Sequence, residues 1–199
     1  MKKDIISRIS ILFIIVGIIL KISNTVINDY KKVYDEKNAR LIIDSMNDNS
    51  HASINHVYKT NIINNYIAVL EIPKIGLRKG LFFPNSKNNN VSKNIAILKP
   101  IQMPSEKNST FILASHSGTS DVSYFNDLYK LRYKDKVYVY YNNVKYKYMI
   151  NDYYEEKKTG SIIIKSNSNI KTIVLTTCKP ISFNKQLVYI GYLYDEEYL

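Results

Sequence analysis

Residues 136–154, KVYVYYNNVKYKYMINDYY, decide the fold class of this chain. Two runs rich in Val, Tyr and Ile flank Asn142 and Asn143. Asn tolerates the positive φ that a tight hairpin turn requires. Because β-branched and aromatic residues are enriched in strands, this stretch predicts a β-hairpin.

The same texture continues over residues 66–199, where short apolar runs are separated by Pro, Gly and Asn clusters. This pattern is typical of an all-β, or β-dominated, domain. About eight strands in so short a stretch favour a closed eight-stranded barrel, because closure hides the strand edges. One segment, VSYFNDLYKL at 122–131, has apolar residues at helical spacing and predicts a short helix. The expected strands are 67–73, 76–83, 94–98, 110–116, 136–142, 144–154, 171–178 and 185–194.

The amino-terminal segment is apolar from Ile9 to Leu20 and is bounded by Arg8 and Lys21. If both charges snorkel to the interface, about one bilayer span is available, so residues 1–23 are expected to form a membrane anchor. Positive charge before the span predicts a single-pass topology with a cytoplasmic amino terminus and an extracytoplasmic remainder. A cleaved signal peptide is the alternative, although no small-residue cleavage site follows the apolar run.

Residues 24–65 connect the anchor to the β-rich domain. Their first half, 24–46, has apolar residues at roughly helical spacing among charges, which predicts a stalk helix. Their second half, 47–65, is polar and without periodicity, which indicates a linker. It holds His51 and His56, which we interpret as solvated side chains rather than metal ligands.

The composition limits the classes of partner and cofactor. The chain of 199 residues has 28 Lys and Arg against 17 Asp and Glu, a formal net charge of +11. Such a charge suits a polyanionic neighbour. With the domain outside the cytoplasm, we expect that neighbour to be the cell envelope rather than nucleic acid. One Cys excludes an internal disulfide, and three His without a Cys pair lack the usual structural zinc spacings. We also expect no bound metal and no obligate cofactor.

Two residues at predicted strand ends can perform chemistry. Cys178 closes the apolar run IVLTTC, and Lys179 and Pro180 then lead the chain out of the sheet. His116 closes the run TFILAS and opens a turn rich in Ser and Gly. A thiol and an imidazole are the minimum for thiol acyl transfer, because the thiolate is the nucleophile and a nearby imidazolium favours it. A buried structural thiol and a hydrogen-bonded turn histidine are the alternative interpretation.

These features in combination resemble the sortases, the membrane-anchored cysteine transpeptidases of Gram-positive bacteria. The resemblance rests on LTTC at 175–178, on the upstream His116, on the opening IAVLEIPKIGL and on the anchor. Val174 departs from the family motif T-L-x-T-C, in which the first residue is Thr. The resemblance implies that Cys178 attacks the Thr–Gly bond of an LPxTG-like sorting signal and that His116 protonates the leaving amine. The thioacyl enzyme would then pass the surface protein to an amino group of the cell wall.

The resemblance also implies a third catalytic residue, an Arg on the last strand in an R-x-L/V-V pattern. Lys185, in KQLVYI, stands at the matching place. It keeps the charge of Arg but loses the planar, bidentate fork. Arg78 and Arg132 are further cations that loops could bring to the site. Five residues are expected to bind substrate. Thr177 is one, and the other four are expected to line an apolar groove for the Leu-Pro portion of the signal: Ile97, Leu98, Ile101 and Ile181.

The subclass within the family is open. The short link KPISFN at 179–184 argues against the haem-protein-anchoring class, and residues 47–65 lack the aspartate-aromatic lid motif of pilus-polymerising members. The acidic residues Asp152, Glu155 and Glu156 resemble the calcium-responsive loop of some sortases. Their neighbours are lysines, and we interpret all three as surface charges.

Two rival functions come from other classes. One is a sortase-like barrel that binds sorting signals or envelope partners without turnover, an interpretation motivated by Lys185 and Val174. The other is an L,D-transpeptidase or papain-like hydrolase. It is disfavoured because those families place a His or a Gly-rich motif around the cysteine, and TTCKP has neither.

Overall fold

The computed structural model describes residues 2–47, 65–165, 169–180, 182 and 184–199, with the side chains at 2–10, 24, 25, 28 and 32 left out of the description. His51 and His56 of the predicted linker, and Ile181 of the predicted groove, lie outside the described residues. The chain divides into two compact units, Met1–Glu36 and Lys37–Leu199.

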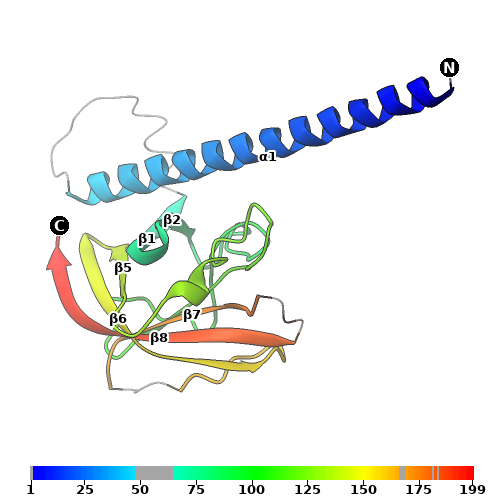
Figure 1. Cartoon of the computed structure of the whole chain (residues 1–199). Helices are drawn as coiled ribbons and strands as arrows, with labels where there is room; N and C mark the ends of the chain where they lie inside the picture. The colour runs from blue at the N-terminus through cyan, green and yellow to red at the C-terminus, as the bar shows by residue number, and fades with distance from the viewer. Residues whose placement is uncertain (1, 48–64, 166–168, 181, 183) are drawn as a thin grey trace. The chain divides into compact units, whose positions relative to one another are not determined.

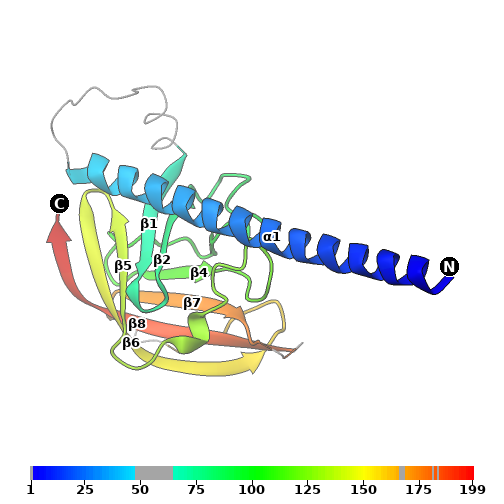
Figure 2. The same ribbon diagram turned by 45° about the horizontal axis from the view of Figure 1, so that its top comes forward.

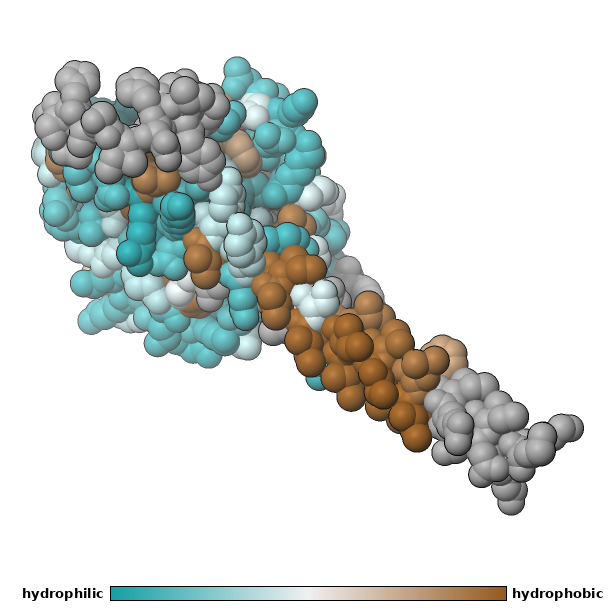
Figure 3. Space-filling model, turned by 90° about the horizontal axis from the view of Figure 1, so that it is seen from above, coloured by the Kyte–Doolittle hydropathy of each residue, from teal (hydrophilic) through white to brown (hydrophobic). Residues whose placement is uncertain are grey.

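The first unit is helical and belongs to α1 (Lys2–Asn47), which also contains the stalk helix expected over 24–46. Its large apolar side chains from Ile11 to Leu20 are exposed, and Figure 3 shows them as a continuous apolar surface of this helical segment. A search of the described residues for a helix long and apolar enough to cross a membrane found none.

The second unit, Lys37–Leu199, contains the last turns of α1 together with the β-rich residues from 66 onward. Ala39 and Ile42, in the last turns of the helix, are buried against Val69 and Tyr140 of the sheet. The end of α1 therefore packs as an integral part of this unit.

Eight strands form one sheet, as the sequence predicts (Figure 1). Two short 3-10 helices, η1 (Pro73–Ile75) and η2 (Leu128–Lys130), connect them. The strands are β1 (Tyr66–Ile72), β2 (Leu77–Phe82), β3 (Ala96–Ile97), β4 (Thr110–Ala114), β5 (Lys136–Tyr141), β6 (Val144–Lys157), β7 (Thr172–Cys178) and β8 (Lys185–Tyr198).

The sheet curls into a barrel that is nearly, not fully, closed. The strand order is β2-β1-β5-β6-β8-β7-β4-β3, so β2 and β3 stand at the two ends. β3 has only two residues, too few to offer β2 a ladder. In its place, the Asn94 side-chain amide donates a hydrogen bond to the Gly80 carbonyl at 2.8 Å. A fully closed barrel was expected, and this side-chain bridge replaces the last strand pairing.

The β5–β6 hairpin confirms the turn predicted at Asn142 and Asn143. Both have positive φ, 49° and 58°, as a two-residue hairpin turn requires. The helix predicted over 122–131 is wrong, because turns followed by η2 occupy this segment. Phe125, Leu128 and Leu131 are all fully buried in the barrel core. Their spacing of three is satisfied by successive tight turns as well as by an α-helix.

Candidate active site

β4 and β7 are parallel neighbours, as Figure 2 shows, and this pairing locates the two chemistry-bearing residues. The register runs from Thr110 opposite Thr172 to Ala114 opposite Thr176. His116 and Cys178 each follow two residues after that last pair. Continuing the register therefore places His116 across from Cys178, at the carboxyl ends of the two strands.

Backbone and hydroxyl hydrogen bonds continue the β4–β7 connection beyond its last pair. The Ser115 backbone N–H donates to the Thr176 carbonyl at 3.3 Å. The Thr177 hydroxyl donates to the Ser115 carbonyl at 2.8 Å, and the Ser117 hydroxyl donates to the Cys178 carbonyl at 2.6 Å. These bonds tie the two strand ends together through the residues before and after His116.

The turn that follows His116 is cross-linked to itself and to the barrel. The Phe125 backbone N–H donates to the His116 carbonyl at 3.1 Å, and the Gly118 N–H donates to Asn126 Oδ1 at 3.0 Å. Tyr124 directly precedes Phe125 in this turn, and the Lys79 ammonium stands 4.4 Å from the centroid of the Tyr124 ring. The sequence did not predict this support, because Lys79 is remote in the chain.

Cys178 and His116 are both half-buried, and the cysteine is a free thiol. A thiol and an imidazole at neighbouring strand ends are the arrangement that acyl transfer through a thioester requires. The site can therefore support a nucleophile and its proton-transfer partner.

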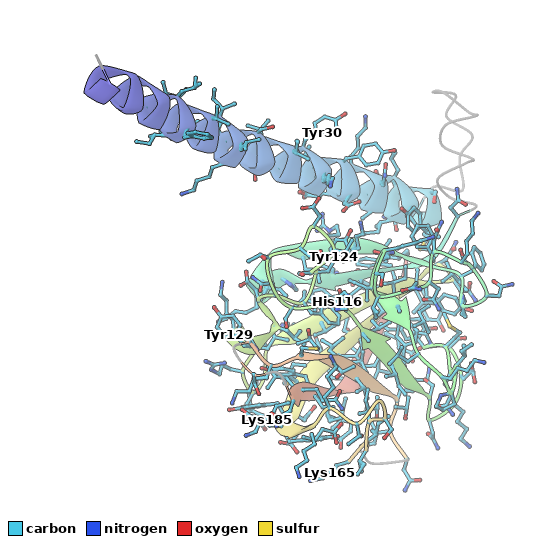
Figure 4. The ribbon with its side chains drawn as sticks, turned by 90° about the vertical axis from the view of Figure 1, so that its right-hand side faces the viewer. Tyr30, His116, Tyr124, Tyr129, Lys165 and Lys185 are labelled. Carbon is cyan, nitrogen blue, oxygen red and sulfur yellow. The ribbon has the colours of Figure 1, made fainter. Side chains whose placement is uncertain are left out.

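The two faces of the sheet separate Cys178 from Lys185. Cys178 pairs with Gln186 across β7 and β8, and paired residues share a face. Lys185, one position earlier, falls on the other face, where its ammonium lies 3.4 Å from Glu155. Lys179 also pairs with Glu155, at 2.6 Å. Figure 4, in which His116 and Lys185 are labelled, shows the two well separated.

The Glu155 carboxylate thus forms ion pairs with two lysine ammonium groups. The hydrogen bond from Lys179, assisted by one from Lys185, holds the pKa of the Glu155 carboxyl below its ordinary value. Glu156 accepts a hydrogen bond from Gln186 at 2.7 Å, and Asp152 accepts one from the Tyr153 N–H at 2.8 Å. Within the described ranges, no group of three or more His, Cys, Asp or Glu side chains could hold a metal ion.

The face that carries Cys178 also carries an apolar patch of four buried side chains, Ile112, Val174, Val188 and Ile190. Ile162 and Ile164, from the segment between β6 and β7, pack over it. That segment is held by the Gln186 amide, which donates to the Ser161 carbonyl at 3.0 Å. The Tyr154 hydroxyl further bonds to the Ile163 carbonyl. We call residues 161–165 the strap.

The structure places the predicted groove residues in different environments. Leu98 packs against the apolar patch. Ile97 is buried within the barrel core, and Thr177 is buried with its hydroxyl engaged on Ser115, so neither presents a free surface to a substrate. Ile101 is 42% exposed.

The other candidate cations are engaged elsewhere. Arg78 forms an ion pair with Glu71 at 2.7 Å, and Arg132 donates to the carbonyls of Tyr129 and Leu131. Two residues that bear on Cys178 were not predicted from the sequence: Gln186, its cross-strand partner, and Ser117, which donates to its carbonyl. Ser117 adjoins His116 in sequence, a signal that was available. The position of Gln186 depends on the β7–β8 register, which the sequence does not disclose.

The matching family model and the matching solved structures are all of one family. A family model, the Sortase domain, matches residues 70–193. A search of curated proteins found no match. Among solved structures, sortase A of Listeria monocytogenes is 20% identical with a TM-score of 0.57, over 68% of this chain and 91% of that one.

Two other classes have similar folds. A Clostridium perfringens sortase D5 transpeptidase is 19% identical, with a TM-score of 0.59 over 81% of this chain and 98% of its own. Streptococcus pneumoniae sortase C is 18% identical, with a TM-score of 0.58 over 80% and 87% of the two chains. At these identities the structural likeness shows the fold, while the family model covers more than half of the chain. The chain belongs to the sortase family of cysteine transpeptidases.

Proposed function

We propose that this chain cleaves an LPxTG-like sorting signal outside the cytoplasm and transfers the released surface protein to an amino group of the cell wall. The observation that carries the proposal is the placement of Cys178 and His116 at neighbouring ends of the parallel strands β4 and β7. Family membership supports the classes of substrate, since sortases act on sorting signals and cell-wall acceptors.

In the first half-reaction, the Cys178 thiolate attacks the carbonyl carbon of the Thr–Gly peptide bond. The tetrahedral intermediate collapses, the C–N bond breaks, and a thioester joins the substrate Thr to Cys178. The His116 imidazolium gives its proton to the leaving amine, which departs neutral. His116 is then a neutral base.

In the second half-reaction, an amino group of the cell wall attacks the thioester carbonyl. Neutral His116 takes a proton from this amine as the new C–N bond forms. The C–S bond breaks and returns Cys178 as a thiolate beside an imidazolium. Atoms and charge balance over the cycle, and no cofactor takes part.

We assign the role of the third residue, which the family fills with an arginine on the last strand, to Gln186 in place of Lys185. Gln186 is the residue paired with Cys178, whereas Lys185 lies on the opposite face with Glu155. Its amide donates to Glu156 and to the Ser161 carbonyl, so it would leave one of these partners in order to donate to a substrate carbonyl. Gln186→Ala is expected to lower thioacylation more than Lys185→Ala does. Gln186→Arg is expected to raise it, because the guanidinium adds charge and a second donor.

The apolar patch beside Cys178 fits the Leu-Pro portion of the signal. It consists of Ile112, Val174, Val188 and Ile190, with Leu98 packed against it. The strap covers this surface, so a bound signal would displace Ile162 and Ile164 and replace their apolar contacts with its own. Leu98 remains a proposed substrate-binding residue.

Sortases are envelope-associated proteins, and we propose that residues 1–23 anchor this chain in the cell membrane. The exposed apolar side chains from Ile11 to Leu20 support the anchor. The positive charges that precede them support a cytoplasmic amino terminus. Membrane fractionation of the full chain, compared with one that lacks residues 1–23, tests this location.

The decisive experiment incubates the full chain, in mild detergent, with LPxTG-type peptides and measures intact mass. The wild type is expected to gain the mass of the acyl fragment, and Cys178→Ala is expected to gain none. His116→Ala should slow the gain strongly while the protein stays folded. A wild-type adduct that persists in Cys178→Ala would refute the assignment of the nucleophile.

Gln186, and not an arginine, is the cross-strand partner of Cys178, which favours one second candidate: a barrel that binds sorting signals without turnover. Retained peptide binding by the folded wild type, without any thioacyl adduct, selects this candidate. Rescue of adduct formation by Gln186→Arg would then locate the missing function at residue 186.

A further inference from the structure

Ser117 forms a direct link between the segment that carries His116 and the strand that carries Cys178. The regular β4–β7 register ends at Ala114 and Thr176. Beyond it, the Ser117 hydroxyl donates to the carbonyl of Cys178 itself, at 2.6 Å. The donor belongs to the residue next to the imidazole, and the acceptor belongs to the nucleophile.

We propose that Ser117 is a positioning residue, whose hydroxyl sets the distance between the His116 imidazole and the Cys178 sulfur. The inference rests on the proposed function, because it concerns the proton transfer between these two groups. Ser117 itself touches no reacting atom. It acts through the backbone of both residues.

The other bonds of this segment do not serve the same purpose. The Phe125 N–H to His116 carbonyl bond and the Gly118 N–H to Asn126 bond tie the turn to itself. The Thr177 hydroxyl bond reaches Ser115, before the histidine, and holds the strands rather than the turn. Ser117 spans from beyond His116 to β7, so it controls how far the turn can move from the thiol.

The catalytic consequence follows from the geometry of proton transfer. An imidazole must stand within hydrogen-bond reach of the group whose proton it moves. A displacement of about 1 Å from productive geometry can cost roughly 100-fold in rate. Loss of the Ser117 bond should therefore lower kcat and leave KM nearly unchanged, because the apolar patch and Gln186 belong to β4, β7 and β8 rather than to this turn.

The test compares variants of the full chain that differ in one hydroxyl. Ser117→Thr and Ser117→Val have nearly the same shape, but only Thr can donate to the Cys178 carbonyl. Ser117→Ala removes the donor with the smallest change in volume. Ser123→Ala is the matched control in the same turn, because the buried Ser123 hydroxyl has no hydrogen-bond partner among the described residues.

Two readouts are taken for each folded variant: kcat and KM with an LPxTG-type peptide, and the rate at which iodoacetamide alkylates Cys178 at pH 7. We expect Ser117→Ala and Ser117→Val to lose about tenfold or more in kcat, with KM within about twofold. Alkylation should slow in the same two variants. Ser117→Thr and Ser123→Ala should behave as the wild type in both measurements.

The outcomes separate this inference from the proposed function. If Ser117→Val matches Ser117→Thr in kcat and in alkylation, Ser117 does not position the pair and the inference is wrong. Alkylation needs no sorting signal. A wild type that acylates no peptide, yet shows slower alkylation in Ser117→Val than in Ser117→Thr, would overturn the proposed substrate and keep the positioning role.

Discussion

Replacement of Ile42 by Ala tests whether the end of α1 is part of the folded unit. Ile42 is 2% exposed and packs with Ala39 against Val69 and Tyr140. The substitution deletes three buried carbon atoms and leaves a cavity between the helix and the sheet. Buried Ile to Ala changes cost about 2 to 5 kcal/mol. Because this site lies between one helix and one sheet face, we expect about 2 to 3 kcal/mol.

The loss is large enough to measure by two methods. In a unit of this size, 1 kcal/mol corresponds to a shift of about 2 to 4 °C in Tm, so a decrease of about 4 to 12 °C is expected. Urea unfolding of the full chain in mild detergent gives the free energy directly. Tyrosine fluorescence can follow it, since the chain has 18 Tyr and no Trp.

The control is Val33→Ala on the same helix, because Val33 is 66% exposed. It should change the free energy of unfolding by less than about 0.5 kcal/mol. If Ile42→Ala is as neutral as Val33→Ala, the end of α1 does not stabilise the barrel, and the assignment of residues 37–47 to the second unit is wrong.

Three further predictions concern the barrel and the apolar patch. Gly191→Ala should destabilise the fold by about 1 to 3 kcal/mol in urea unfolding. An added Cβ would stand 3.2 Å from the Met149 carbonyl oxygen and 3.0 Å from the Ile173 side chain. An unchanged urea midpoint would show that the strands shift to accommodate the methyl group. Burial raises the pKa of Tyr189 to about 12 and that of Tyr148 further still. The contribution of these two neutral tyrosines to the free energy of unfolding is therefore full below pH 10, the ordinary pKa of an unfolded tyrosine, and is lost as the pH rises toward 12. Equal urea midpoints at pH 8 and pH 11.5 would contradict this. Leu98→Ala should raise KM for an LPxTG-type peptide several-fold with little change in kcat, because Leu98 packs on the apolar patch; a change in kcat alone would remove Leu98 from signal binding.

The sequence predicts the strands of this fold well, because composition and turn residues are local signals. All eight expected strands are present, and the Asn142–Asn143 turn is confirmed. A helix was wrongly predicted over 122–131 because Phe125, Leu128 and Leu131 are spaced by three, and both successive turns and a helix produce this spacing. The closure between β2 and β3 depends on the Asn94 amide, a long-range contact without a sequence pattern.

In the candidate site, too, local signals could be predicted from the sequence and long-range contacts could not. Cys178 and His116 could be singled out because each ends an apolar run, and the structure brings these strand ends together. Their catalytic roles remain predictions. Lys185 was chosen by motif spacing, but a shift of one position on a strand reverses the face. The β7–β8 register assigns that face to Gln186.

The parallel pairing of β4 with β7 is also the folding step that brings Cys178 and His116 together. The two strands are separated in the chain by the whole β5–β6 hairpin, so their pairing closes a long loop. Such non-local pairings form slowly, because the entropy of loop closure is lost before the contacts stabilise the chain. Before that step, the chain carries an isolated cysteine without its base. In a chain that crosses the membrane before β4 pairs with β7, the nucleophile and its base would therefore meet only outside the cytoplasm.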